Sequence, residues 1–224
     1  MDAALDHIDT WIFDLDNTLY PSNCNLFALI DDRMGRYIAR RFGVDRQEAH
    51  RIQKQYFYNH GTTLSGLMTE HDVDPYEFLD FVHDIEMDRI TPNPSLAAAI
   101  DALPGRAFIF TNGDAPYARR VLDRLGLGSC FDGLFDIHDS GYAPKPHAAC
   151  YDKMCDTLNV EPNRALFVED MARNLRPAKA LGMATVWINN GSDYGAADAC
   201  PSFIDYETHE VGDWLATYTR KAAA

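Results

Sequence analysis

Short apolar segments separated by helical patterns restrict the fold of this chain more than any other feature. The apolar segments cover residues 11–13, 107–110, 134–137, 165–168 and 184–188. The helical patterns between them cover residues 115–125, 146–158 and 172–181, and a last edge strand at 203–204 and helix at 211–218 complete the series. Strands that alternate with helices form parallel sheets covered on both faces. We therefore predict an α/β fold with a Rossmann-like parallel sheet.

The region between the first two predicted strands, residues 22–90, shows helical patterns only. Asp45 and Glu48 form a capping-box pattern ahead of apolar residues at helical spacing. We therefore predict an all-helical cap domain at 22–90, inserted into a core domain of residues 1–21 and 91–224. Because the insert follows the first strand directly, it is expected to lie over the carboxyl ends of the strands as a lid.

Composition excludes several classes of function. The 224 residues carry a formal net charge of −14, which repels the phosphate backbone of a nucleic acid polymer. No apolar run approaches the roughly 18 residues of a membrane helix, and the polar N-terminus does not resemble a signal peptide. Five irregularly spaced cysteines are typical of reduced thiols. We expect a cytoplasmic protein with neither membrane nor nucleic acid partners, as a monomer or homodimer.

Two acidic residues, Asp14 and Asp16, end the first predicted strand in the segment Phe13–Tyr20. Their spacing lets both carboxylates reach one crevice, where their repulsion favours a bound cation. One acid is then suited to act as a nucleophile and the other as a general acid and base. The alternative is a turn in which the acids accept hydrogen bonds from free amides.

Polar residues also end the second predicted strand, and a lysine precedes a later helix. Thr111, Asn112 and Gly113 offer a hydroxyl, an amide and close backbone approach to a phosphoryl group. Lys145, held between two prolines, could neutralise a transferring phosphate. A turn that caps the next helix and a solvated lysine are the alternatives.

Glu169 and Asp170 end the predicted strand at 165–168 and are natural ligands for a hard cation. An acidic helix N-terminus is the alternative for this pair. Asn174, one helical turn later, could orient Lys145 through a hydrogen bond or lie on the helix surface. Active sites of open parallel sheets lie at these carboxyl ends, so we expect the polar segments to meet there.

These four segments, in this order, resemble the motifs of the haloacid dehalogenase-like hydrolase superfamily. Asp14-Leu15-Asp16-Asn17-Thr18 is similar to its first motif, Thr111 to its second, Lys145 to its third and Glu169-Asp170 to its fourth. The helical insert resembles a type-1 cap of this superfamily. The segments 13–20 and 56–67 more narrowly resemble the pyrimidine 5′-nucleotidase branch. In the fourth motif, Met171 replaces a common small hydroxyl residue.

The resemblance implies a magnesium-dependent phosphatase that works through an aspartyl phosphate. Asp14 would be the nucleophile and Asp16 the general acid and base, with Thr111 and Lys145 stabilising negative charge. Mg²⁺ would be held by Asp14, the main-chain carbonyl of Asp16, Asp170 and Glu169, the last directly or through water. An acid at position 16 disfavours dehalogenation, because a halide leaves without a proton.

The cap is expected to select the leaving group. His60, Thr62 and Thr63 could contact the substrate, and Tyr56 or Tyr58 could either stack on a base or form the cap core. A pyrimidine nucleoside monophosphate such as UMP or CMP is the leading substrate, and a sugar phosphate or phosphoglycolate is the alternative. A non-catalytic phosphate-binding regulatory protein on the same scaffold is the alternative of a different class.

Overall fold

Six parallel strands form one sheet in the computed structural model, which describes residues 5–222, with side chains described to residue 218. The sheet order is β3-β2-β1-β4-β5-β6. The strands are β1 (Thr10–Phe13), β2 (Arg106–Phe110), β3 (Gly133–Phe135), β4 (Ala165–Glu169), β5 (Ala184–Ile188) and β6 (Tyr206–Thr208). The predicted α/β class with a Rossmann-like parallel sheet is confirmed.

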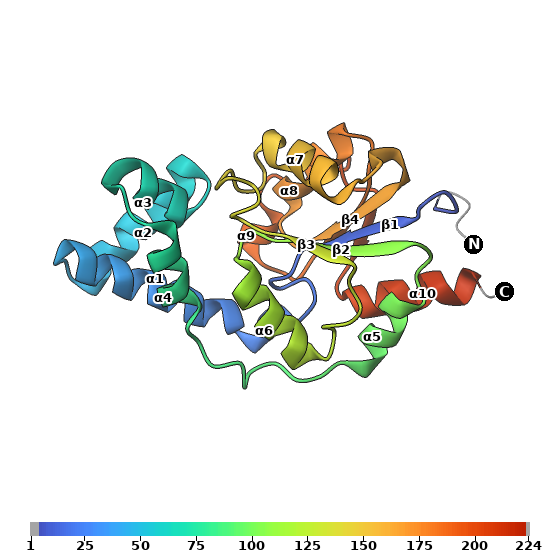
Figure 1. The fold of residues 1–224 in the computed structure, drawn as a ribbon, viewed down its shortest axis with the longest axis horizontal. Coiled ribbons are helices and arrows are strands. Elements are labelled where there is room, and N and C mark those ends of the chain that lie inside the picture. Colours follow the sequence, from blue (N-terminus) through green and yellow to red (C-terminus); the bar gives the residue numbers. More distant parts are fainter. Residues whose placement is uncertain (1–4, 223–224) are drawn as a thin grey trace.

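Helices cover both faces of this sheet (Figure 1). One face packs against α5 (Pro94–Asp101), α6 (Ala115–Leu125) and α10 (Val211–Ala222), and the other against α7 (Ala148–Leu158) and α8 (Ala172–Ala180). Successive side chains of a strand point to opposite faces. Trp11 and Phe13 therefore belong to one buried cluster, and Ile12 belongs to the other. Short elements η2 (Pro162–Arg164) and α9 (Asp193–Ala196) complete the core.

Two expectations for the core need correction. The edge strand is β6, at 206–208, and not residues 203–204. The apolar side chain of Phe203 is instead buried in the cluster beneath α8. Helix α5 lies outside the predicted helical patterns. Asn93 caps this helix by accepting a hydrogen bond from the amide of Leu96 at 3.1 Å, and Pro94, a residue that is common in the first helical turn, begins it.

Four helices, which we call the cap helices, lie between β1 and α5. They are α1 (Leu26–Phe42), α2 (Arg46–His60), α3 (Thr63–His71) and α4 (Pro75–His83), preceded by the short η1 (Ser22–Cys24). Asp45 caps the N-terminus of α2 as predicted, because its Oδ1 accepts a hydrogen bond from the amide of Glu48 at 2.8 Å. The cap helices lie beyond the carboxyl ends of the strands (Figure 1). Within the described residues, no helix combines the length and apolarity needed to cross a bilayer.

Candidate active site

The carboxyl ends of β1 and β4 bring three acidic side chains together. The register of these neighbouring strands pairs Phe13 with Val168, and the amide of Asp14 donates to the carbonyl of Val168 at 2.9 Å. Asp14 therefore stands beside Glu169 and Asp170. Carboxylate oxygens of these three residues all lie within 4.8 Å of one another, and all three residues are buried.

A buried lysine completes this cluster from the segment ahead of α7. Nζ of Lys145 donates to Oδ1 of Asp14 and to Oε2 of Glu169, both at 2.7 Å. Its third bond goes to the main-chain oxygen of Phe110 at 2.8 Å. Only 2 % of Lys145 is exposed, so its charge is neutralised by carboxylates and not by water. Asp14 and Lys145 therefore meet at this site although they lie more than 100 residues apart in sequence.

The turn after β2 holds this lysine in place. The side chain of Asn112 accepts from the main-chain amide of Lys145 at 2.8 Å and donates to its carbonyl at 3.3 Å. Both ends of the Asn112 amide group therefore contact the Lys145 backbone. Thr111 is buried, and its hydroxyl oxygen accepts from the amide of Gly113 at 2.9 Å. Asn112 is therefore joined to the acidic cluster through Lys145, and Thr111 and Gly113 lie in the same turn.

The two acids of the fourth segment have different partners. Glu169 contacts Lys145 with one oxygen and accepts from the amide of Met171 at 3.1 Å with the other. Asp170 accepts from Nδ2 of Asn190 at 3.1 Å. Asn174 is buried, so it does not lie on the helix surface. Its Oδ1 has no hydrogen-bond partner among the described residues, so it does not orient Lys145 either.

The acidic cluster fits a hard divalent cation such as Mg²⁺. Such ions prefer oxygen ligands and are commonly held by one or two carboxylates. Asp14, Glu169 and Asp170 supply only oxygen donors, and three buried carboxylates exceed the one charge of Lys145. Asp170 has the most free ligand atoms, because only its Oδ2 accepts a hydrogen bond. Both oxygens of Asp14 accept, from Lys145 and Thr18, as do both oxygens of Glu169.

Crowding and burial change the proton affinities of Asp14 and Asp170. Burial and the charge of Glu169 raise the pKa of Asp14 to about 7, against the opposing effect of Lys145. Burial and the same neighbour raise the pKa of Asp170 well above its ordinary value. Burial lowers the pKa of the Lys145 ammonium, but the charges of Asp14 and Glu169 outweigh this effect and raise it. The lysine therefore stays charged, and a second cation would favour the ionised forms of Asp14 and Asp170.

We expect the metal-free protein to lose stability as pH rises from 4 to 8. The unfolded chain releases the Asp14 proton near pH 3.8 and the folded chain near 7. Below about pH 4 both the folded and the unfolded forms hold this proton. Above about pH 7 neither holds it, and the free energy of unfolding is lower by a constant amount, on the order of 4 kcal/mol. Mg²⁺ should therefore raise the unfolding temperature more at pH 8 than at pH 5, as measured by thermal unfolding with Mg²⁺ or with EDTA.

The matched control for this experiment is Asp14→Asn, which removes the shifted carboxyl group and one ligand. The stabilisation by Mg²⁺ at pH 8 should become smaller in this variant. An equal increase in unfolding temperature at both pH values in the unaltered protein would contradict a metal site made of these carboxylates.

Asp16 lies beside the cluster and has two partners that the sequence analysis did not identify. Its Oδ1 accepts from the hydroxyl of Tyr117 at 2.5 Å and from that of Tyr20 at 2.6 Å. Burial raises the pKa of Asp16, and these two hydrogen bonds partly oppose that effect. Tyr20 lies in the segment 13–20 and could have been noticed there, whereas the spacing of Tyr117 indicates only a residue of the apolar face of α6.

The predicted cap residues have hydrogen-bond and ion-pair partners within the cap helices and the turns that join them. Thr62 caps α3 by accepting from the amide of Ser65 at 3.1 Å, and the buried Thr63 donates to the carbonyl of Gln53 at 3.4 Å. His60 lies 3.5 Å from Glu70. The structure therefore assigns Thr62 and Thr63 local roles in the cap and does not join them to the acidic cluster.

Tyr56 and Tyr58 differ in their surroundings. Tyr56 packs inside the cap, where its hydroxyl lies 2.5 Å from Nε2 of His71 and its ring fills the space left by Gly66. Tyr58 is 64 % exposed and lies near Tyr194 of the core. Of the two rings, Tyr58 is therefore the one available to a ligand.

Contacts between the cap helices and the core surround the site. On one side, the guanidinium of Arg173 lies 4.8 Å from the ring centre of Phe57. On the other side, Tyr76 stacks on His138 at 4.4 Å. The turn between α2 and α3 approaches the lysine segment, because a Cβ added to Gly61 would lie 3.5 Å from Pro144. The α2–α3 turn therefore stands over the segment that carries Lys145.

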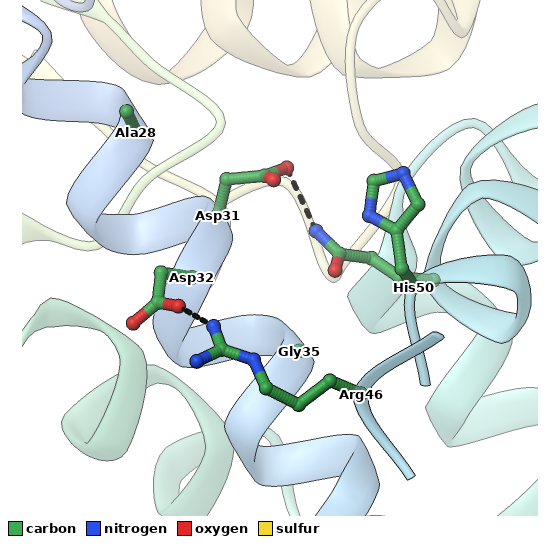
Figure 2. Close-up of a pocket in the computed structure, with 7 residues that line it drawn as sticks. Ala28, Asp31, Asp32, Gly35, Arg46 and His50 are labelled. Atoms are coloured by element: carbon green, nitrogen blue, oxygen red, sulfur yellow. Dashed lines mark hydrogen bonds and ion pairs between the residues drawn. The ribbon is translucent and has the colours of Figure 1, made fainter. Parts of the chain in front are cut away.

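A separate surface pocket of about 240 Å³ lies within the cap, between α1 and α2 (Figure 2). Its charged side chains already contact one another: Asp32 pairs with Arg46, and Asp31 accepts from Gln53 at 2.8 Å. His50 extends from α2 beside them (Figure 2). Since this pocket contains none of the residues of the acidic cluster, we do not place the chemistry there.

Several known proteins resemble this chain in sequence and in fold. The chain is 26% identical over 195 residues to a glyceraldehyde 3-phosphate phosphatase of Methanopyrus kandleri, which covers 80% of this chain and 83% of the relative. It is 25% identical over 193 residues to phosphate metabolism protein 8 of Saccharomyces cerevisiae, covering 79% of this chain. The chain spans only 60% of that yeast relative, and smaller parts of several others.

A solved structure also resembles this chain in fold. The crystal structure of a phosphatase of this class from Thermococcus onnurineus superposes with a TM-score of 0.62 and 22% identity, covering 96% of this chain and 98% of the other. Residues 8–182 match the family model described as haloacid dehalogenase-like hydrolase. This match covers most of the chain and includes every segment of the acidic cluster, so the protein belongs to the haloacid dehalogenase-like hydrolases.

Proposed function

We propose that this protein is a Mg²⁺-dependent phosphatase that hydrolyses small phosphate monoesters through a phosphorylated Asp14. The observation that carries the proposal is the convergence of Asp14, Lys145 and Asp170, with Glu169, at one sheet edge. Relatives named as phosphatases support it. The whole of residues 22–90 would be a cap domain on a core of residues 1–21 and 91–224.

The residues have distinct roles in this proposal. Asp14 attacks phosphorus, and the bond from phosphorus to the leaving oxygen breaks as Asp14 becomes phosphorylated. Asp16 gives a proton to the leaving oxygen and later takes one from the water that hydrolyses the acyl phosphate. Lys145 and Thr111 stabilise negative charge on the phosphoryl oxygens. When bound, Mg²⁺ supplies Lewis-acid stabilisation of the same oxygens.

The proposed substrate is a pyrimidine nucleoside monophosphate, UMP or CMP. The proposal rests on the resemblance of segments 13–20 and 56–67 to that branch, and on the exposed ring of Tyr58 at the cap–core boundary. Base stacking on an exposed aromatic ring is a common mode of nucleoside binding. His60 and the α2–α3 turn are the cap groups proposed to lie nearest the leaving group.

A sugar phosphate is the second candidate substrate. The relative from Methanopyrus kandleri, which this chain covers to 83%, is named a glyceraldehyde 3-phosphate phosphatase. Both candidates are alkyl phosphate esters and require the same groups at the carboxyl ends of the strands. They differ only in what the cap must accommodate.

A phosphate-release screen with Mg²⁺ decides between the candidates. We expect kcat/KM for UMP and CMP to exceed that for glyceraldehyde 3-phosphate and phosphoglycolate by about 10-fold or more. EDTA should abolish release from every ester. A reversed order would favour the second candidate, and no release from any ester would leave the phosphate-binding regulatory protein as the better explanation.

A further inference from the structure

We propose that Tyr117 and Tyr20 are positioning residues for Asp16, which fix the carboxylate oxygen that exchanges a proton with the substrate. This inference rests on the proposed function, in which Asp16 is the general acid. It adds Tyr20, at the end of the segment 13–20, and Tyr117, which lies on α6 and outside the four family segments. It also assigns different roles to the two oxygens of one carboxylate.

The evidence is the convergence of two phenols on a single oxygen atom. Tyr117 and Tyr20 donate to Oδ1 of Asp16 at 2.5 and 2.6 Å, and their own hydroxyl oxygens lie 3.5 Å apart. The other oxygen, Oδ2, accepts no hydrogen bond from the described side chains. An oxygen that accepts two short hydrogen bonds is the poorer site for a proton. Oδ2 is therefore the oxygen that remains free to exchange a proton with the substrate.

The two phenols are themselves held rigidly. Tyr117 and Tyr20 are both buried, with 1% and 2% of their surface exposed. Close packing limits the ring of Tyr117 on one side, since a Cβ added to Gly113 would lie 3.2 Å from it. The absence of a side chain at Gly113 therefore permits this ring position. Fixed donors cost no reorganisation when the proton moves.

A histidine from the end of the cap helices supports the ring of Tyr117. His83 stacks on it at 4.4 Å with an interplanar angle of 14°, and Nδ1 of His83 lies 3.0 Å from Oδ1 of Asp114. Arg120 donates to the main-chain oxygen of His83 at 2.9 Å. The orientation of Asp16 therefore depends on contacts made by the last residue of α4.

The test uses the acidity of the leaving group. An alkoxide leaves only with a proton, whereas p-nitrophenolate leaves readily without one. Since kcat/KM reports the step that phosphorylates Asp14, loss of acid orientation should affect alkyl esters selectively. We expect Tyr117→Phe to lower kcat/KM about 10-fold for the best alkyl ester of the screen and about twofold or less for p-nitrophenyl phosphate. Tyr20→Phe should act similarly, and the double variant more strongly.

Two reference variants make the outcome unambiguous. Tyr37→Phe removes a phenol that donates to Glu77 at 3.3 Å within the cap, and it should change neither substrate's kcat/KM. Asp16→Asn should show the largest selective loss for the alkyl ester. If Asp16→Asn lowers kcat/KM selectively for the alkyl ester but neither tyrosine variant does, the positioning role is wrong while the proposed function stands.

Other outcomes also give clear answers. Equal losses on both substrates in Tyr117→Phe and Tyr20→Phe, with unchanged thermal unfolding, would indicate a general structural role and overturn the inference. If Tyr117→Phe does not fold, Tyr20→Phe alone decides, because Tyr20 lies in the segment after β1 and not in a helix. If Asp16→Asn loses both activities equally, the acid role itself fails and the inference fails with it.

Discussion

Replacing Asp14 by Asn is expected to lower kcat about 10⁵-fold or more, the size of loss seen when an enzyme loses its nucleophile. The amide of Asn cannot attack phosphorus at a useful rate, and it also removes one carboxylate from the acidic cluster. The measurement is phosphate release with Mg²⁺ under conditions that saturate the unaltered protein. The loss should be the same for alkyl esters and for p-nitrophenyl phosphate, because both must phosphorylate residue 14.

A surface variant controls for the change in charge. Asp152→Asn removes a carboxylate from the exposed side of α7, and it should leave kcat unchanged within about twofold. Mass spectrometry of the unaltered protein, quenched in acid during turnover, should find one phosphoryl group on the peptide that contains Asp14. Undiminished turnover by Asp14→Asn would reject the covalent mechanism.

Replacing Lys145 by Met is expected to destabilise the metal-free protein by about 3–5 kcal/mol near pH 8. The variant leaves Asp14 and Glu169 buried without the ammonium that both contact at 2.7 Å. Equilibrium denaturation by urea measures the change in the free energy of unfolding. At pH 5 the loss should be smaller, because the raised pKa of Asp14, about 7, lets that carboxyl group take up a proton.

The matched control is Lys153→Met, which removes an exposed ammonium from α7 and should change stability by less than about 0.5 kcal/mol. Activity gives an independent measurement, since Lys145→Met should also lower kcat/KM strongly for every ester. A variant that keeps the stability of the unaltered protein at pH 8 would show that the buried carboxylates do not need this partner.

Prediction succeeded where residue pattern and sheet geometry are directly linked. Apolar strands followed by helices require a parallel sheet, and polar residues directly after those strands must lie at one edge. Asp14 and Glu169 meet because β1 and β4 are neighbours with Phe13 opposite Val168. The motif order alone was sufficient to predict that these segments converge.

Prediction failed where a side chain's partner comes from a distant element. The sequence did not indicate that the side-chain amide of Asn112 binds both main-chain groups of Lys145. Tyr117 follows the apolar spacing of α6, and nothing in that spacing indicates a hydroxyl bonded to Asp16. Such roles depend on distances between elements, which local sequence patterns do not contain.

By itself, the sequence determined the class of the sheet, the helical nature of the insert and the acidic and basic groups at the strand ends. These features follow from periodicity and from residues adjacent along the chain. Only the tertiary structure decided how those groups are paired: Lys145 with Asp14 and Glu169, and Asp16 with Tyr20 and Tyr117. The physical reason is that a buried polar atom without a hydrogen bond is costly. Its partner is therefore whichever group the packing of distant helices and strands brings within hydrogen-bond distance.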